Sequence, residues 1–138
     1  MDEKNISSKF TIPSASALIV CKGKILWVRS QTTRDKWAPP GGKVERKETP
    51  TEAAIREVKE EVGLEIKIDR KMRTYLYHTQ NKEYEIDCFL ASTKMTDLKL
   101  NSEIIIAKWC TPEESKNLKL TLTARQALED FLKIKAVQ

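Results

Sequence analysis

The residues of this chain best suited to chemistry are glutamates that gather between positions 48 and 61. Glu57, Glu60 and Glu61 have the i, i+3, i+4 spacing that places side chains on one face of a helix. Two carboxylates about 5 Å apart repel by roughly 3 kcal/mol at an effective dielectric constant near 20. A divalent cation removes that repulsion, and ligands that are all oxygen favour Mg²⁺ or Mn²⁺. A solvated acidic face is the alternative interpretation.

The segment that carries these glutamates has the features of an amphipathic helix. Thr49 is a suitable N-cap residue, Pro50 suits the first helical position, and Glu52 completes a capping-box pattern. Gly63 is suited to the left-handed turn that ends a helix. Apolar residues repeat on a second face at Ile55, Val58 and Val62. The helix is therefore expected to pack that face on a core and to present the glutamates elsewhere.

Residues 42 to 64 resemble the Nudix hydrolase signature at every defined position. The signature is Gly, five residues, Glu, seven residues, Arg-Glu, an aliphatic residue, any residue, Glu-Glu, any residue, Gly and an aliphatic residue. These positions hold Gly42, Glu48, Arg56, Glu57, Val58, Glu60, Glu61, Gly63 and Leu64. The Trp-x-x-Pro-Gly-Gly segment and the order of strands and helices also resemble the family over about residues 12 to 134.

The resemblance implies a fold, a reaction and a metal site. The fold would be α/β (α+β), the α/β/α sandwich of the Nudix family with a mixed central sheet. The reaction would be hydrolysis of a nucleoside diphosphate linked to another moiety, with Mg²⁺ or Mn²⁺ as cofactor. Glu48 would support the metal ligands or join them through water. The implied ligands are Glu57, Glu60, Glu61 and the backbone carbonyl of Gly41.

The catalytic roles that the resemblance implies fall on an arginine and a general base. Arg56 is expected to orient Glu48 and other motif carboxylates as a bidentate donor. A surface pair with Glu52 or Glu60 is the alternative. The base differs among family members, and the candidates here are Glu57, Glu60 and a downstream glutamate. Glu103 is the best placed downstream glutamate. The alternative interpretation of Glu103 is a surface glutamate at the end of a strand.

Basic and aromatic residues around the loop that enters the signature are candidates for substrate binding. Arg29, Lys36 and Lys43 are candidates for pairing with phosphates, although each is also typical of an ordinary surface. Trp37 is a candidate for stacking on a nucleobase, with a core anchor as the alternative.

The substrate class follows from markers that the chain lacks. The arrays that distinguish NADH pyrophosphatases and ADP-ribose pyrophosphatases have no match after the signature. A MutT-like enzyme that splits a nucleoside triphosphate to monophosphate and pyrophosphate is therefore the leading hypothesis. ADP-ribose, a dinucleoside polyphosphate and an RNA 5′ end remain alternatives. A Nudix module that binds nucleotide or RNA without hydrolysis is a further one.

Charge and composition bear on three other classes of protein: nucleic-acid binders, membrane proteins and secreted proteins. The net charge is +5, but the lysines are spread along the chain, so stable nucleic-acid binding is not expected. Ala15 to Cys21, the longest near-continuous apolar run, is too short to cross a bilayer. The N-terminus lacks the pattern of a secretory signal, which predicts a cytoplasmic protein. The protein is expected to be a monomer or a homodimer. The widely spaced cysteines are expected to be buried and reduced: Cys21, Cys88 and Cys110.

The chain is expected to form one domain over residues 10–138, after a flexible tail at residues 1–9. A loop is predicted over Thr93 to Ser102, and a short helix starts at Thr111. A closing helix is expected to begin at a capping box formed by Thr123 and Gln126. The predicted strands are Ser14 to Cys21, Lys24 to Arg29, a short one from Val44, Leu64 to Ile68, Met72 to Thr79, Tyr84 to Ala91 and Ile104 to Cys110.

Overall fold

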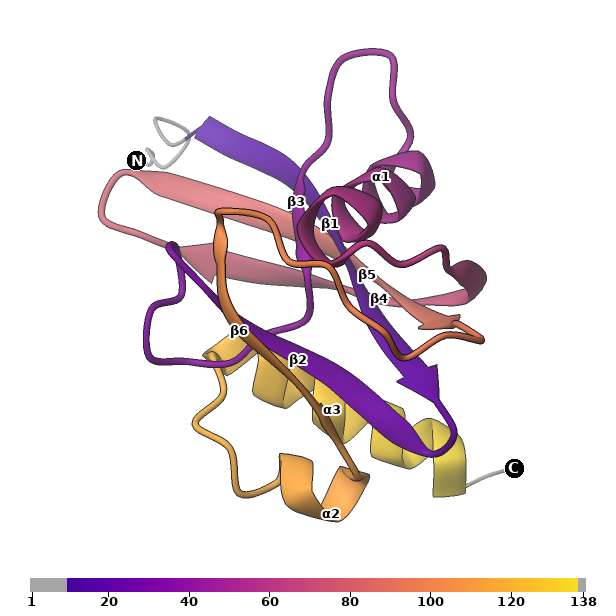
Figure 1. Cartoon of the computed structure of the whole chain (residues 1–138). Helices are drawn as coiled ribbons and strands as arrows, with labels where there is room; N and C mark the ends of the chain where they lie inside the picture. Colours follow the sequence, from indigo (N-terminus) through magenta and orange to yellow (C-terminus); the bar gives the residue numbers. More distant parts are fainter. Residues whose placement is uncertain (1–9, 137–138) are drawn as a thin grey trace.

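The computed structural model describes residues 10 to 136, so the predicted tail at residues 1–9 lies outside the described part. The strands are β1 (Phe10–Cys21), β2 (Lys24–Ser30), β3 (Gly41–Lys43), β4 (Lys67–His78), β5 (Lys82–Ser92) and β6 (Ile104–Cys110), and the helices are α1 (Pro50–Val62), α2 (Pro112–Ser115) and α3 (Leu122–Ala136). Figure 1 shows their arrangement. None of these helices is both long enough and apolar enough to span a membrane.

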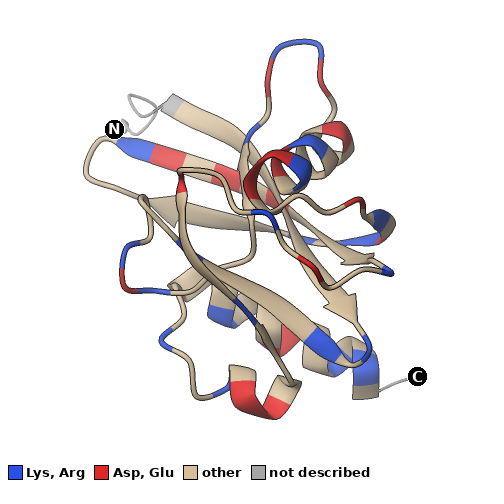
Figure 2. Cartoon of the chain, viewed as in Figure 1, with Lys and Arg blue, Asp and Glu red and all other residues tan. Residues whose placement is uncertain are grey.

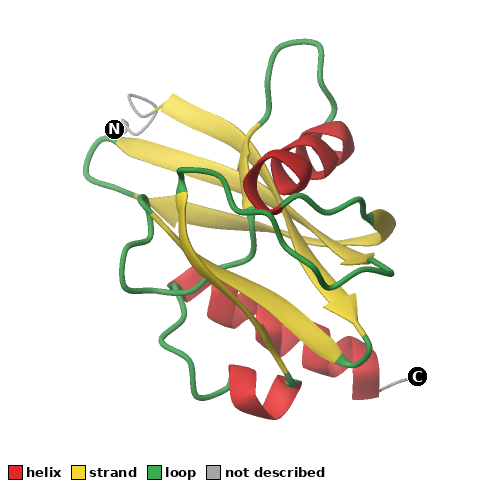
Figure 3. Cartoon of the chain, viewed as in Figure 1, coloured by secondary structure: helices red, strands yellow, loops and turns green. Residues whose placement is uncertain are grey.

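The strands form one mixed sheet between the helices. The strand order is β4-β5-β1-β2-β6, and β3 pairs with β1 outside this path. The β1–β5 pair is parallel, and the other pairs are antiparallel. Helix α1 covers one face of the sheet, while α2 and α3 lie on the other side (Figure 3). The predicted mixed sheet with helices on both faces is confirmed.

Three hydrophobic clusters fill the space between the sheet and its helices, and the two larger ones face α1 and α3. On the α1 side, Val58 and Val62 pack with Leu26. On the α3 side, Leu128 and Phe131 pack with Trp27. Burial of these apolar side chains fixes α1 against the sheet, so the glutamates on its other face keep a defined position. All three cysteines are buried and unpaired, as predicted.

Helix α1 begins and ends where the sequence predicted. The hydroxyl of Thr49 accepts a hydrogen bond from the Glu52 amide at 3.1 Å, and the Glu52 carboxylate accepts one from the Thr49 amide at 2.9 Å. This is the reciprocal pattern of a capping box. At the other end, Gly63 has φ of 77° and its amide donates to the Lys59 carbonyl. The local chemistry of these residues is enough to set both ends.

Some strand ends differ by a few residues, since β1 begins at Phe10 rather than Ser14 and β5 spans Lys82–Ser92, and three further predicted boundaries are wrong. The predicted strands Leu64 to Ile68 and Met72 to Thr79 are replaced by one strand, β4, which begins only at Lys67 and whose register shifts near Ile68 and again near Lys71. The charged residues between them interrupt the apolar pattern, but an edge strand exposes them to solvent. The short strand is Gly41–Lys43 and ends before Val44.

The third wrong boundary is the start of α3. The helix begins at Leu122, and the hydroxyl of Thr121 accepts a hydrogen bond from the Ala124 amide at 3.1 Å. The cap is therefore Thr121 rather than Thr123. Its position is set from outside the helix, because the Thr121 amide donates to the Trp37 carbonyl at 3.0 Å.

Candidate metal centre

Three carboxylates from two separate parts of the chain meet beside α1. Glu57 and Glu61 lie on α1, and Glu103 lies in the loop just before β6. Each offers an oxygen, and these oxygens all lie within 4.8 Å of one another. The acidic residues of α1 and the start of β6 are coloured in Figure 2. The structure thus joins two of the expected ligands with the downstream glutamate that was a candidate base.

Glu61 is the buried member of this cluster, with a relative exposure of 7%. One oxygen accepts a hydrogen bond from the Gly41 amide at 3.2 Å. None of the ion pairs found within residues 10–136 includes Glu61. Burial, and after it the neighbouring Glu57 carboxylate, raise the pKa of Glu61 to about 8.

These features fit a hard divalent cation. The donors are all carboxylate oxygens, which Mg²⁺ and Mn²⁺ prefer. A positive charge among Glu57, Glu61 and Glu103 would offset both their repulsion and the burial of Glu61. Without one, a proton does part of this work near neutral pH, as the raised pKa of Glu61 indicates.

Arg56 organises the outer side of the cluster. Its Nε and Nη2 donate to the two oxygens of Glu48 at 2.7 and 3.1 Å, so the pair is bidentate. Its Nη1 donates to Glu57 at 3.0 Å and to Glu60 at 3.2 Å. The guanidinium holds the pKa of Glu48 below its ordinary value, chiefly through these hydrogen bonds. Arg56 thereby fixes the carboxylates of Glu48 and Glu57.

The other expected ligands lie around the cluster rather than within it. Glu60 has a side-chain exposure of 54% and points to Arg56, outside the group of three converging carboxylates. Glu48 is occupied by Arg56. Gly41 contacts the cluster through its amide, which donates to Glu61, whereas the sequence assigned a role to its carbonyl. Glu48 and Glu60 therefore lie outside the three converging carboxylates, and Arg56 joins them to the cluster through its bond to Glu57.

The two glycines of β3 leave room for this arrangement. A methyl group on Gly42 would lie 2.5–2.7 Å from the carboxyl group of Glu57. A methyl group on Gly41 would collide with the backbone of β1 at Ala15 and Ser16. Gly42 thus leaves space for the Glu57 side chain, and Gly41 leaves space for the neighbouring strand β1.

The four predicted substrate contacts lie on β2, on β3 and in the loop between them. The Arg29 guanidinium lies 5.8 Å from the centre of the Trp37 ring, and its Nε donates to the Arg34 carbonyl at 2.8 Å. Trp37 is half-buried and packs against the core on the α3 side, as its alternative interpretation expected. Lys36 and Lys43 are exposed.

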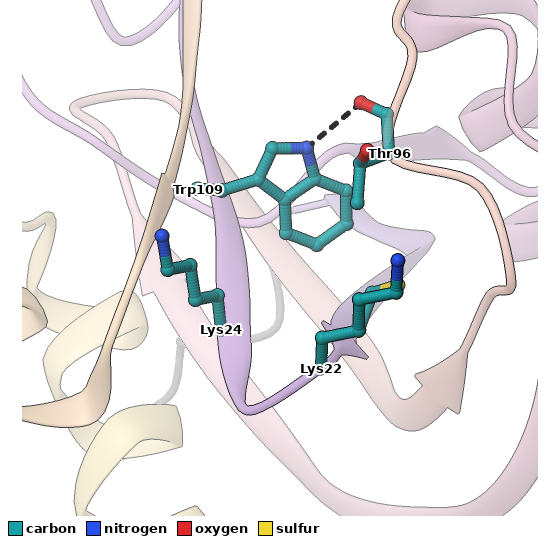
Figure 4. Close-up of a pocket in the computed structure, with 5 residues that line it drawn as sticks. Lys22, Lys24, Thr96 and Trp109 are labelled. Carbon is teal, nitrogen blue, oxygen red and sulfur yellow. Dashed lines mark hydrogen bonds between the residues drawn. The ribbon is translucent and has the colours of Figure 1, made fainter.

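The predicted loop after β5 is bound to the rest of the protein at several points. Lys99 and Asn101 donate backbone hydrogen bonds to the carbonyls of Val62 and Glu61, both at the end of α1. The Trp109 indole donates to the Thr96 carbonyl at 3.0 Å (Figure 4). This attachment was not predicted from the sequence. Asn101, two residues before Glu103, was the available signal, because asparagine often bonds the backbone two residues on.

Figure 4 also shows a hollow beside Trp109, lined by Cys21, Lys22, Lys24, Thr96 and Trp109. Trp109 lies six residues along the chain from Glu103, which corresponds to roughly 20 Å of extended strand. The hollow is therefore separate from the carboxylate cluster.

The NUDIX domain matches residues 11–131, which is most of the chain. The chain belongs to the Nudix hydrolase family. This Nudix hydrolase is similar to the CTP pyrophosphohydrolase of Escherichia coli (strain K12), with 25% identity over 130 residues, 92% of this chain and 96% of the relative.

Two further comparisons concern a structure and a different class of substrate. The crystal structure of a MutT protein from Methanosarcina mazei Go1 has a TM-score of 0.83 and 29% identity, covering 92% of this chain and 96% of that one. The human diphosphoinositol polyphosphate phosphohydrolase 3-beta is 42% identical over 65 residues, which is 39% of this Nudix hydrolase and 40% of the relative. The first similarity spans the whole fold, and the second is local.

Substitution of the β3 glycines tests the close packing around Glu57. Gly42→Ala is expected to weaken Mn²⁺ binding about tenfold or more, because the added methyl displaces the Glu57 carboxylate. Its unfolding free energy should stay within about 1 kcal/mol of wild type, since a flexible side chain can move. Gly41→Ala should instead cost about 1–3 kcal/mol of stability. Urea unfolding and Mn²⁺ titration measure both effects, and wild-type affinity in Gly42→Ala would contradict this account.

The pH dependence of stability tests the burial of Glu61. Its pKa is about 8 in the folded protein and 4.5 ordinarily, so the folded state binds more protons between these values. The wild type, in chelator, should therefore lose stability relative to Glu61→Gln as pH rises from about 4.5 to 8. Mg²⁺ should restore it increasingly over the same range. Urea unfolding of both proteins across this range measures the effect, and a difference that stays constant would refute it.

Proposed function

We propose that this Nudix hydrolase cleaves a nucleoside triphosphate to a monophosphate and pyrophosphate, with Mg²⁺ or Mn²⁺ as cofactor. The observation that carries the proposal is the convergence of Glu57, Glu61 and Glu103 within 4.8 Å. All three oxygen donors suit a hard cation, and Glu61 is buried without an ion-pair partner among residues 10–136. Phosphoanhydride hydrolysis is the reaction for which such a cation is most useful.

In this proposal the three converging carboxylates hold the cation, and the groups around them either support these ligands or take part in the reaction. When bound, the cation neutralises charge on the phosphate oxygens and makes phosphorus easier to attack. Glu57, Glu61 and Glu103 are its ligands. The Gly41 carbonyl is a further candidate, and Glu48 supports the set through its bidentate pair with Arg56.

Glu60 is the general base of the proposed reaction. It is exposed to water and shares the Arg56 Nη1 group with Glu57, which keeps it beside the cluster. Glu60 accepts the proton that the attacking water releases, while the water oxygen forms a bond to phosphorus. The phosphoanhydride P–O bond breaks, and its electron pair leaves with pyrophosphate. This assignment leaves Glu57 and Glu103 free to act as ligands.

Support for a nucleotide substrate comes from the relative and from the basic residues near the entry loop. The relative that matches over nearly its whole length carries the name CTP pyrophosphohydrolase. The guanidinium of Arg29 and the half-buried Trp37 offer a cation and an aromatic ring side by side. These groups suit a triphosphate and a base, and exposed Lys36 and Lys43 suit phosphates.

A second candidate substrate class has one observation in its favour. The local 42% identity is to a diphosphoinositol polyphosphate phosphohydrolase, and the net charge of +5 suits such an anion. An assay of candidate substrates should therefore include a diphosphoinositol polyphosphate beside nucleoside triphosphates, ADP-ribose, dinucleoside polyphosphates and triphosphorylated RNA.

The proposed function predicts a loss of turnover for three single substitutions. With a nucleoside triphosphate and Mg²⁺, Glu57→Gln and Glu61→Gln should lose about a thousandfold in kcat, since each removes a ligand charge. Glu60→Gln should lose about 10²–10⁴-fold and also lose the fall in rate at low pH, as expected for a base. Chromatography of the products, with ¹⁸O-labelled water to locate the phosphorus attacked, measures all three.

Glu65→Gln provides the matched control, because Glu65 is exposed and pairs with Lys59 outside the cluster. It should retain wild-type turnover. Wild-type turnover in Glu57→Gln would overturn the proposed site. Tight nucleotide binding without any product in Mg²⁺ or Mn²⁺ would instead favour a binding module.

A further inference from the structure

We propose that Asn101 is a positioning residue of the site, which holds Glu103 against the end of α1. The inference rests on the proposed function, because it assigns Asn101 a role in assembling the cation ligands. Asn101 lies in the loop after β5 and is half-buried. Its side-chain oxygen accepts a hydrogen bond from the Glu103 amide, so its carboxamide is expected to act on the site through Glu103.

Three hydrogen bonds place Asn101 between the two halves of the cluster. Its amide donates to the carbonyl of Glu61 at 3.0 Å. Its side-chain oxygen accepts from the Glu103 amide at 3.0 Å. Its carbonyl accepts from the Ile104 amide at 3.2 Å. Asn101 therefore bonds both to the backbone of Glu61 on α1 and to the backbone of Glu103, whose carboxylate must approach that of Glu61.

The bond to Glu61 also satisfies the end of α1. The last carbonyls of a helix lack partners within the helix. The loop supplies two, since the amides of Lys99 and Asn101 donate to Val62 and Glu61. A loop that caps the helix in this way has a fixed position relative to the glutamates of its last turn.

Glu103 needs such support because its position is unfavourable. Its side chain is exposed, and its carboxylate approaches those of Glu57 and Glu61. Repulsion would move it outward in the absence of a cation. Its backbone is held on both sides: the amide bonds to Asn101, and the carbonyl accepts from the Gln31 amide at 2.9 Å. Of these two bonds, the one to Asn101 uses a side chain and can be removed by substitution.

The remaining attachments of the loop lie farther from the cluster and provide a control. The Thr93 hydroxyl donates to the Glu65 carbonyl at 2.8 Å, at the other end of the same loop. Thr93→Val removes one side-chain hydrogen bond from the loop, as Asn101→Ala does, but leaves the contacts of Glu103 intact. Comparison of the two variants separates positioning of Glu103 from general loosening of the loop.

The test measures Mn²⁺ affinity, by electron paramagnetic resonance of the free ion, and steady-state kinetics with a nucleoside triphosphate. Asn101→Ala should weaken Mn²⁺ binding about 10–100-fold, as loss of a group that orients a ligand does. Its kcat should fall similarly with little change in KM for the nucleotide. Asn101→Ser, which keeps a hydroxyl acceptor, should recover most of both losses. Thr93→Val should match wild type in both.

A double substitution tests whether Asn101 acts through Glu103. In a Glu103→Gln background, Asn101→Ala should cause little further loss, because the carboxylate that it positions is already gone. Equal losses in both backgrounds, or a Thr93→Val variant as impaired as Asn101→Ala, would overturn the inference. So would wild-type Mn²⁺ affinity in a folded Asn101→Ala. If the wild type itself bound no Mn²⁺ and cleaved no nucleotide, that result would contradict the proposed function itself rather than only the role of Asn101.

Discussion

The rest of the site depends on one unfavourable contact, the approach of Glu57, Glu61 and Glu103 to within 4.8 Å. Like charges at this distance repel, and burial of Glu61 adds to the cost, as its raised pKa indicates. A folded protein keeps such a contact only where packing enforces it. The observed arrangement is therefore best understood as a site that is complete only with a counter-charge.

Several features enforce the contact from different directions. Apolar packing of Val58 and Val62 fixes α1 on the sheet, and the capping box at Thr49 fixes its start. The absence of a side chain at Gly42 leaves room for Glu57. Arg56 bonds to Glu48 and Glu60 outside the cluster and to Glu57 within it, so its guanidinium fixes one edge of the converging group. Within residues 10–136, Glu57 thus has a cationic partner, whereas Glu61 and Glu103 have none.

The sequence predicted most of what is local and less of what is tertiary. The ends of α1 follow from residues close in sequence, and the bidentate Arg56–Glu48 pair was expected from the resemblance to the Nudix signature; the structure contains both. The cap of α3 was misplaced because Trp37, distant in sequence, positions Thr121. The continuity of β4 was missed because bulges and edge exposure hide its alternation.

The same division holds within the site. Spacing alone put Glu57, Glu60 and Glu61 on one helix face, but it could not show that Glu60 lies outside the converging group while Glu57 and Glu61 lie within it. Nor could it show that Glu103 completes the inner set, because that contact requires a loop folded back on α1. Tertiary contacts thus decide which carboxylates face one another.

The most direct test of this account is anomalous diffraction from crystals soaked in Mn²⁺ with a non-hydrolysable nucleotide. The account predicts a peak about 2 Å from carboxylate oxygens of Glu57, Glu61 and Glu103. The peak should be absent in Glu61→Gln. A strong manganese peak elsewhere, with these three carboxylates unoccupied, would contradict the central claim.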